Sequence, residues 1–170
     1  MNHEIHERHE SGMGLMGHMG PMKAISLWEP WASAMALGLK ENETRSWWTG
    51  WRGDVVICAA KRKMTREDEE TFRLLVTPNA DYEPQYGKAL CVVRIFDCLP
   101  SAAFHSEAAP FQIGLTEAAL GNYEVGRWVW GTVDLRRLRN PVPIVGRQGL
   151  WNLEPTIAEQ IERELPEDKT

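Results

Sequence analysis

Hydrophobic residues in this chain gather in short runs, separated by charged segments or by segments rich in glycine and proline. Runs of this length that contain many β-branched residues are typical of buried or half-buried strands. The pattern predicts strands at residues 23–27, 54–60, 88–98, 127–135 and 150–153, and an extended segment at 141–145. One more strand is expected directly after Lys40, which makes about five to six strands in all.

Two of the predicted helices begin at a proline. Trp31–Leu37 is rich in alanine and follows Pro30, which costs no hydrogen bond at the first helical position. Gly38 is well placed to end this helix in a left-handed cap. A terminal helix is predicted over residues 155–165, with an acidic and exposed side.

Another helix is predicted to begin after Thr65. Asp68 follows three residues later, which resembles a capping box in its acidic form, and the pattern continues to about Val76. Residues 100–126 are punctuated by proline and glycine, and they predict a lid or insertion with short helices, of which Thr116 is a candidate cap.

The spacing of the strands is irregular, and helices interrupt them without strict alternation. This favours an α+β fold built on a small, mostly antiparallel β-barrel with flanking helices. We interpret residues 1–21 as a leader or tag-like tail, 22–153 as the folded domain, and 154–170 as an acidic C-terminal helix and tail.

Length and composition are those of an ordinary globular domain. The chain has 170 residues, of which 43% are hydrophobic and 25% are charged. Its net charge of −5 is carried by its ends, because residues 1–21 hold −2 and residues 154–170 hold −4, which leaves +1 for the body. The body therefore lacks the strongly basic balance of a general nucleic-acid binder, although clustered bases can still bind phosphate locally.

The cysteines and the absence of certain motifs limit the kinds of site that we expect. The three cysteines, Cys58, Cys91 and Cys98, lie in apolar runs without a CxxC pair, so we expect reduced, buried cysteines in a cytoplasmic protein. No metal-ligand spacing occurs in the body and no glycine-rich phosphate loop occurs anywhere, so we expect neither a metal nor another cofactor. No apolar run approaches the ~18 residues of a transmembrane helix, and we expect a monomer.

The most unusual stretch is Gly38–Trp48, which follows the first predicted helix. If the residues after Lys40 are extended, side chains alternate between two faces, and Glu43, Arg45 and Trp47 point the same way. Lys40, at the preceding turn, can reach that side. A carboxylate between two cations is costly to bury unless it has a role, although an ordinary salt-bridged strand edge would look similar.

These side chains suit either catalysis or binding. A desolvated Lys40 could act as a nucleophile or general base, and Glu43 could relay a proton from water to a leaving amine. In a passive pocket, Glu43 could instead accept from the exocyclic amine of a base, while Arg45 holds a phosphate. A tryptophan could stack on that base.

Other candidate ligand contacts lie just beyond this stretch. Stacking of a base on an aromatic side chain contributes ~1–3 kcal/mol. The candidates are Trp47, Trp48 and Trp51 for stacking, and Lys61, Arg62, Lys63, Arg136, Arg137 and Arg139 for phosphate. The alternative for the basic runs is a solvated loop. The remaining tryptophans that we assign to core packing are Trp28, Trp31, Trp130 and Trp151.

The motif GxKxxExR is complete in Gly38, Lys40, Glu43 and Arg45. It lies in register between ISLWEPWASAMALG and WRGDVVICAAKR, and RWVWGTVDLRRL and PVPIVGRQGLWNL follow. Together these segments resemble the ASCH domain family, a branch of the PUA-like β-barrel superfamily. The likeness covers roughly residues 22–153.

The resemblance implies a barrel with a cleft lined by the motif residues, and RNA binding by likeness to PUA domains. Some small relatives are amidohydrolases that remove the acyl group from N4-acylated cytidine nucleosides, with the motif lysine as nucleophile or base and a threonine and a glutamate assisting. Another relative cleaves single-stranded RNA. The lysine corresponds to Lys40, but Glu43 stands where the catalytic threonine would be, and a glutamate cannot replace a hydroxyl.

Three functional hypotheses follow from the residues and the resemblance. We predict an RNA- or nucleotide-binding module whose ligand contacts include Lys40, Glu43 and Arg45. The alternative is a hydrolase acting on a modified nucleoside or on single-stranded RNA, with Lys40 and Glu43 as the catalytic residues. A protein-interaction module with a vestigial pocket is the third hypothesis.

Overall fold

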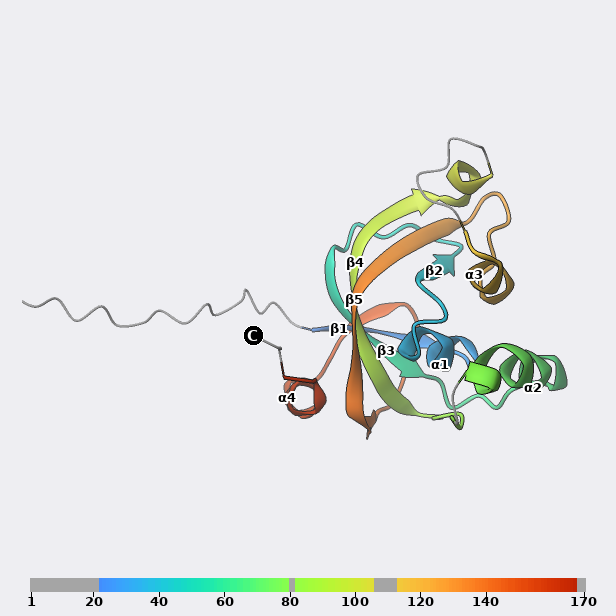
Figure 1. The fold of residues 1–170 in the computed structure, drawn as a ribbon. Coiled ribbons are helices and arrows are strands. Elements are labelled where there is room, and N and C mark those ends of the chain that lie inside the picture. Colours follow the sequence, from blue (N-terminus) through green and yellow to red (C-terminus); the bar gives the residue numbers. More distant parts are fainter. Residues whose placement is uncertain (1–21, 80–81, 106–112, 168–170) are drawn as a thin grey trace, which may run out of the picture.

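The computed structural model describes residues 22–79, 82–105 and 113–167, which form a curled six-stranded sheet with helices on both sides (Figure 1). The strands are β1 Lys23–Leu27, β2 Asn42–Arg45, β3 Gly53–Ala59, β4 Lys88–Pro100, β5 Trp128–Pro143 and β6 Leu150–Asn152. Their order is β2-β5-β4-β3-β1-β6, and the paired strands are antiparallel except for β1 with β3. The sheet curls into a half-barrel, which confirms the predicted α+β, mostly antiparallel class.

The helices occupy the connections between strands and the end of the described chain. They are α1 Trp31–Ala36, α2 Arg66–Thr71, α3 Leu115–Leu120 and α4 Pro155–Glu164, with a π-helical turn at Phe72–Val76 and 3-10 turns at Thr77–Asn79 and Ser101–Phe104. Figure 1 shows α4 on one side of the curled sheet, and α1 and α2 on the other. The predicted leader, residues 1–21, lies outside the described residues.

Helix α1 directs the chain into the charged stretch. Gly38 has φ +72°, which confirms the predicted left-handed stop. The main-chain nitrogens of Leu39 and Lys40 then donate to the carbonyl of Ala34, at 2.9 and 3.2 Å. Pro30 is the N-cap residue, one position earlier than predicted. The cap and these two hydrogen bonds fix the backbone of Lys40 against the end of the helix, two residues before β2.

The second predicted helix forms as expected at its start. Thr65 and Asp68 make the reciprocal hydrogen bonds of a capping box, and the helical path continues through Phe72–Val76 as a π-helical turn. The predicted cap at Thr116 is wrong. The N-cap is Gly114, two residues before Thr116 and in an extended conformation, so helix α3 begins at Leu115.

The predicted strand 127–135 and extended segment 141–145 are parts of one strand, β5, of 16 residues. Its register with β4 shifts at three places, and Asp134 adopts φ +53°. Such bulges bend a strand and increase its local twist. The bend allows β5 to pass from the mouth of the half-barrel to the surface under α4, and the whole arginine-rich run, Arg136–Arg139, lies inside this strand.

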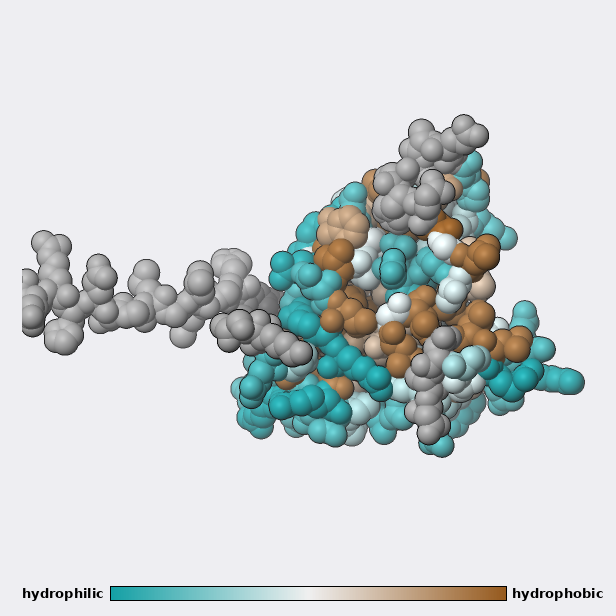
Figure 2. Space-filling model, in the orientation of Figure 1, coloured by the Kyte–Doolittle hydropathy of each residue, from teal (hydrophilic) through white to brown (hydrophobic). Residues whose placement is uncertain are grey.

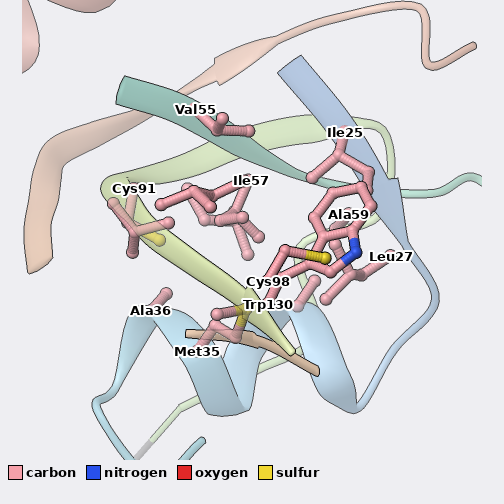
Figure 3. Close-up of a cluster of buried hydrophobic side chains, with 14 residues drawn as sticks. Ile25, Leu27, Met35, Ala36, Val55, Ile57, Ala59, Cys91, Cys98 and Trp130 are labelled. Atoms are coloured by element: carbon pink, nitrogen blue, oxygen red, sulfur yellow. The ribbon is translucent and has the colours of Figure 1, made fainter. Parts of the chain in front are cut away.

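The sheet separates two hydrophobic cores, because alternate strand residues face opposite sides. The core on the α1 side is shown in Figure 3, and it includes Ile25, Leu27, Met35, Val55, Ile57, Cys91, Cys98 and Trp130. The core on the α4 side includes Ala24, Val56, Cys58, Val92, Leu138, Val142 and Ile161. Helix α4 contributes Ile161, which is fully buried.

The cysteines are free and buried, as predicted. Burial raises the pKa of the Cys58 thiol to about 12, and burial likewise raises the pKa of Cys91 above its ordinary value. Both thiols are therefore packing groups. Among the helices in the described residues, none is long and apolar enough to cross a membrane.

Candidate functional site

A cleft of about 360 Å³ lies beside β2, and residues from four separate segments line it. The lining residues are Ser26, Leu27, Trp28, Trp31, Lys40, Glu43, Thr44, Arg45, Ala119, Leu120, Gly121, Asn122 and Arg127. On the face drawn in Figure 2, hydrophobic residues gather over the region where α1, β2 and α3 lie in Figure 1, with hydrophilic residues around them. The cleft thus combines an apolar surround with charged side chains.

Lys40 is a buried cation between two carboxylates. Its Nζ lies 3.7 Å from Oε2 of Glu43 and 3.8 Å from Oε1 of Glu117, and it also donates to the carbonyl of Asn42. Only 3% of Lys40 is exposed. Two carboxylates and a carbonyl replace the water that this ammonium loses on burial, which is the condition for burying a charge at tolerable cost.

Glu117 is held by donors from two other segments. Its Oε2 accepts from the main-chain nitrogen of Glu41 at 2.5 Å, and its Oε1 accepts from the hydroxyl of Tyr123 at 2.6 Å. Burial, together with this hydrogen bond to Glu117, raises the pKa of Tyr123 well above its ordinary value. Tyr123 is therefore a fixed hydroxyl donor, and Glu117 joins α3 to the start of β2.

Two arginines line the cleft, and only one of them is paired with a carboxylate of the described residues. Nε of Arg45 lies 2.9 Å from Oε1 of Glu43, an ion-pair distance, although its N–H direction does not satisfy hydrogen-bond geometry. Within the described residues, the guanidinium of Arg127 donates to carbonyls alone, from Nη2 to Thr44 at 3.1 Å and from Nε to Asn122 at 3.2 Å. No carboxylate of the described residues lies within ion-pair distance of Arg127, so its charge is uncompensated there.

Tryptophans of the β1–α1 connection form the aromatic wall of the cleft. Trp28 and Trp31 both line it, and Trp28 is 51% exposed. The prediction that Trp28 belongs to the core is therefore wrong, because this connection lies at the mouth of the half-barrel. The guanidinium carbon of Arg62 lies 3.8 Å from the centre of the Trp28 ring, a cation–π contact that brings Arg62 to the rim.

The structure brings three of the seven predicted site residues together, namely Lys40, Glu43 and Arg45. Trp47 and Trp48 follow them in sequence but are not among the residues that line the cleft. The ring of Trp47 packs edge-on against buried Trp130, with the ring centres 4.6 Å apart. Trp48 is 56% exposed, outside the cleft lining.

The two remaining predicted residues, Lys61 and Arg62, come from the turn after β3. Arg62 reaches the cleft through Trp28, and it also lies 3.5 Å from a carboxylate oxygen of Asp68. Lys61 lies against Gly87 and lines a different cavity. The third member of the basic run, Lys63, has its ammonium 3.9 Å from the centre of the Tyr86 ring. All three residues are exposed, but each of them contacts a defined group.

Several residues of the cleft, and of the charged network beside it, were not predicted as site residues. Arg127 and Asn122 line the cleft, while Glu117 and Tyr123 belong to the network around Lys40. All four come from the segment interpreted as a lid or lie directly before β5. Neither α3 nor this segment carries a sequence motif, and the only signal was the possibility that residues 100–126 cover a site.

The arrangement offers more free donors than free acceptors. Glu43 and Glu117 are engaged by Lys40, Arg45, Tyr123 and a main-chain N–H, as described above. Arg127 and Arg45 keep guanidinium N–H groups beyond those that contact protein atoms. Such a site suits an anionic or carbonyl-rich ligand. Within the described part of the chain, no group of His, Cys, Asp or Glu is arranged to hold a metal ion.

Comparison with known proteins finds a matching family and relatives that share part of this chain. The family model described as "ASCH domain" matches residues 25–142. "Activating signal cointegrator 1" of Homo sapiens is 33% identical over 89 residues, which are 49% of this chain and 15% of that protein. The protein of the same name from Mus musculus is 36% identical over 89 residues, which again are 49% of this chain and 15% of that protein. The chain thus matches only about 15% of the length of these relatives.

Solved structures resemble the fold as a whole. The crystal structure of ASCH from Zymomonas mobilis has a TM-score of 0.50 and 13% identity, and the match covers 86% of this chain and 96% of that one. A variant of that protein with one tyrosine replaced by phenylalanine has a TM-score of 0.53, again at 13% identity and 86% of this chain, with 100% of that chain covered. Identity this low supports the fold alone.

Proposed function

The chain belongs to the ASCH domain family, and we propose that its cleft binds a nucleotide, either free or as part of a single-stranded RNA. The phosphate lies at Arg127 and Arg45, and the base stacks on Trp28. Glu43 and Lys40 form the floor beneath them. The PUA-like half-barrel of the family and the charged and aromatic groups that line the cleft both support nucleotide binding.

One observation carries the proposal. A half-exposed tryptophan and an uncompensated arginine line the same cleft. Stacking requires an accessible aromatic face, and phosphate binding requires a cation that a carboxylate has not already neutralised. Trp28 provides the first and Arg127 the second. A cleft of about 360 Å³ also falls within the usual range for small-ligand sites.

The hydrolase alternative has less support from the geometry. Lys40 already contacts two carboxylates and a carbonyl, so its amine is not free to attack a substrate. Glu43 is engaged by Lys40 and Arg45 and supplies no hydroxyl. These contacts favour binding without turnover, and a turnover assay distinguishes the two functions.

The test compares nucleoside 5′-monophosphates with the matching nucleosides by isothermal titration calorimetry. We expect Arg127→Ala to weaken monophosphate binding about tenfold, because it removes a charge-assisted contact. We expect little change for the nucleoside and a smaller dependence of affinity on salt. Arg163→Ala is the matched control, since Arg163 is exposed on α4, across the sheet.

Trp28→Ala should weaken nucleosides and monophosphates alike, because it removes the stacking surface. The proposal is wrong if no monophosphate binds, or if Arg127→Ala and Arg163→Ala behave the same. Release of cytidine from N4-acetylcytidine, abolished by Lys40→Ala in a folded protein, would establish the hydrolase alternative instead.

A further inference from the structure

A second cavity, of about 480 Å³, lies between the end of β5, the strand β6 and the start of α4. Lys61, from the turn after β3, also lines it, together with Arg147, Trp151, Glu154 and Ile157. Its lining is mostly apolar, with one aromatic ring and two cations. None of these residues belongs to the cleft described above.

The basic run at residues 61–63 joins the cleft to the second cavity. Arg62 stacks on Trp28 of the cleft, while its neighbour Lys61 lines the second cavity. Main-chain hydrogen bonds fix the start of this turn to the segments on either side of β3. The nitrogen of Ala60 donates to the carbonyl of Leu27 at the end of β1, at 2.8 Å. The nitrogen of Gly87, just before β4, donates to the carbonyl of Ala59, also at 2.8 Å.

The two sites also meet across the loop after β5. Gly146 packs so closely on Ser26 of the cleft that a Cβ atom at this position would lie 2.4 Å from the Ser26 Oγ. Val145 and Arg147, the residues on either side of Gly146, line the second cavity. A side chain at position 146 would have to displace the Ser26 hydroxyl, so this one loop separates the two sites.

The second cavity has the groups that a nucleotide requires. Trp151 provides an aromatic surface, and Lys61 and Arg147 provide cations. Arg147 lies 3.3 Å from a carboxylate oxygen of Glu154 in an exposed pair, which solvent weakens. No carboxylate of the described residues lies within ion-pair distance of Lys61, so its ammonium is available to a phosphate.

We infer that the second cavity takes another nucleotide of the same strand, so that the protein binds a single-stranded oligonucleotide across both sites. Lys61, Arg62 and Lys63 contact the phosphates between them. This inference rests on the proposed function of the cleft. A continuous basic turn between two aromatic sites favours a polyanionic strand over a peptide, because each nucleotide presents one base and one charge.

The test measures affinity against oligonucleotide length. Uridine 5′-monophosphate and oligouridylates of increasing length are titrated against the wild-type protein and against the double variant Lys61→Ala/Arg147→Ala. We expect wild-type affinity to rise at least tenfold from the mononucleotide to the longer strands. We expect the double variant to lose most of this gain and to keep normal binding of the mononucleotide at the cleft, because both of its changed side chains lie outside the cleft. Arg163→Ala should retain the full gain.

Trp151→Phe is the second variant, since it keeps an aromatic ring next to the α4-side core. It should retain a length dependence that the double variant loses. The inference is overturned if mononucleotides bind but longer strands bind no more tightly, or if the double variant keeps the full gain. Tight binding of an acidic, apolar peptide that depends on Lys61 and Arg147, with RNA affinity unchanged, would replace it with a protein-docking surface. Failure of every nucleotide and strand to bind overturns the proposed function as well.

Discussion

Two buried acidic sites flank helix α1, and they differ in what holds their charge. Glu29, at the start of the helix, is 0% exposed. Its carboxylate accepts from the nitrogen and hydroxyl of Ser33, at 3.1 and 2.8 Å, and from the nitrogen of Gln85 at 3.0 Å. Glu43 and Glu117, beyond the end of the helix, pair instead with the ammonium of Lys40.

The difference separates a structural contact from a candidate site. We call Glu29 and its donors, Ser33 and Gln85, the clamp. All donors to Glu29 are neutral groups of the fold, and Glu29 lines neither of the two cavities described here. Glu43 and Lys40 are part of a cleft wall where Arg127 keeps an uncompensated charge. A buried carboxylate is therefore no sign of function by itself. The informative feature is a charged network next to an open cavity with unused donors.

The largest effect is expected at the clamp. Glu29→Ala should lower the free energy of unfolding by about 3–5 kcal/mol, because it leaves two buried donors of Ser33 and the part-buried nitrogen of Gln85 without an acceptor. It also removes the carboxylate that caps the first turn of α1. Chemical denaturation followed by tryptophan fluorescence measures the loss.

Glu29→Gln provides the control, because the amide keeps one acceptor oxygen. We expect it to recover part of the loss, and we expect nucleotide affinity per folded molecule to stay close to wild type in Glu29→Gln. A Glu29→Gln protein that folds normally but no longer binds would mean that the clamp and the cleft are one site.

A smaller effect is expected at the charged network. Lys40→Met should lower the free energy of unfolding by about 2–3 kcal/mol, since it leaves Glu43 and Glu117 facing each other without a cation. Adding Glu117→Gln should recover part of this loss, because one of the two charges is then removed. A double-mutant cycle measures the coupling. If the two losses simply add, Lys40 and Glu117 do not interact and the network is a set of independent buried charges.

Local sequence signals predicted the frame around both sites. Gly38 ends α1 because only a residue without a side chain readily adopts φ +72°. The capping box at Thr65 and Asp68 follows from hydrogen bonds within one helical turn. The motif spacing brought Lys40, Glu43 and Arg45 together because these residues lie within one short segment. Such features depend on a few neighbouring residues, so the sequence determines them locally.

The remaining features depend on contacts between distant segments. Glu117 binds the nitrogen of Glu41 across 76 residues of sequence, and no pattern near either residue indicates this. Trp28 was predicted as core because tryptophan is large and apolar, but its exposure is decided by the open side of the half-barrel. The clamp at Glu29 was not predicted either, since its partner Gln85 comes from a distant loop.

The smallest effect concerns the tyrosine beside each buried acid. Burial raises the pKa of Tyr82, with Glu29 adding to the rise and a hydrogen bond with Ser33 opposing it. Burial and the hydrogen bond to Glu117 raise the pKa of Tyr123 further. A raised pKa favours the neutral phenol in the folded state, so its stabilising contribution is complete below a pH of about 10 and falls as the pH rises further.

Tyrosinate absorbance during an alkaline titration should therefore show Tyr82 ionising before Tyr123, each above the ordinary range. Tyr82→Phe and Tyr123→Phe identify the two steps, because each variant lacks one of them. Both variants should also lose less stability than wild type between pH of about 9 and 11, by about 1 kcal/mol or less. Ionisation of Tyr123 at or below the pH at which Tyr82 ionises would show that Glu117 does not accept a hydrogen bond from the Tyr123 hydroxyl. The cleft network would then resemble the clamp, where the hydroxyl of Ser33 lies between acid and phenol.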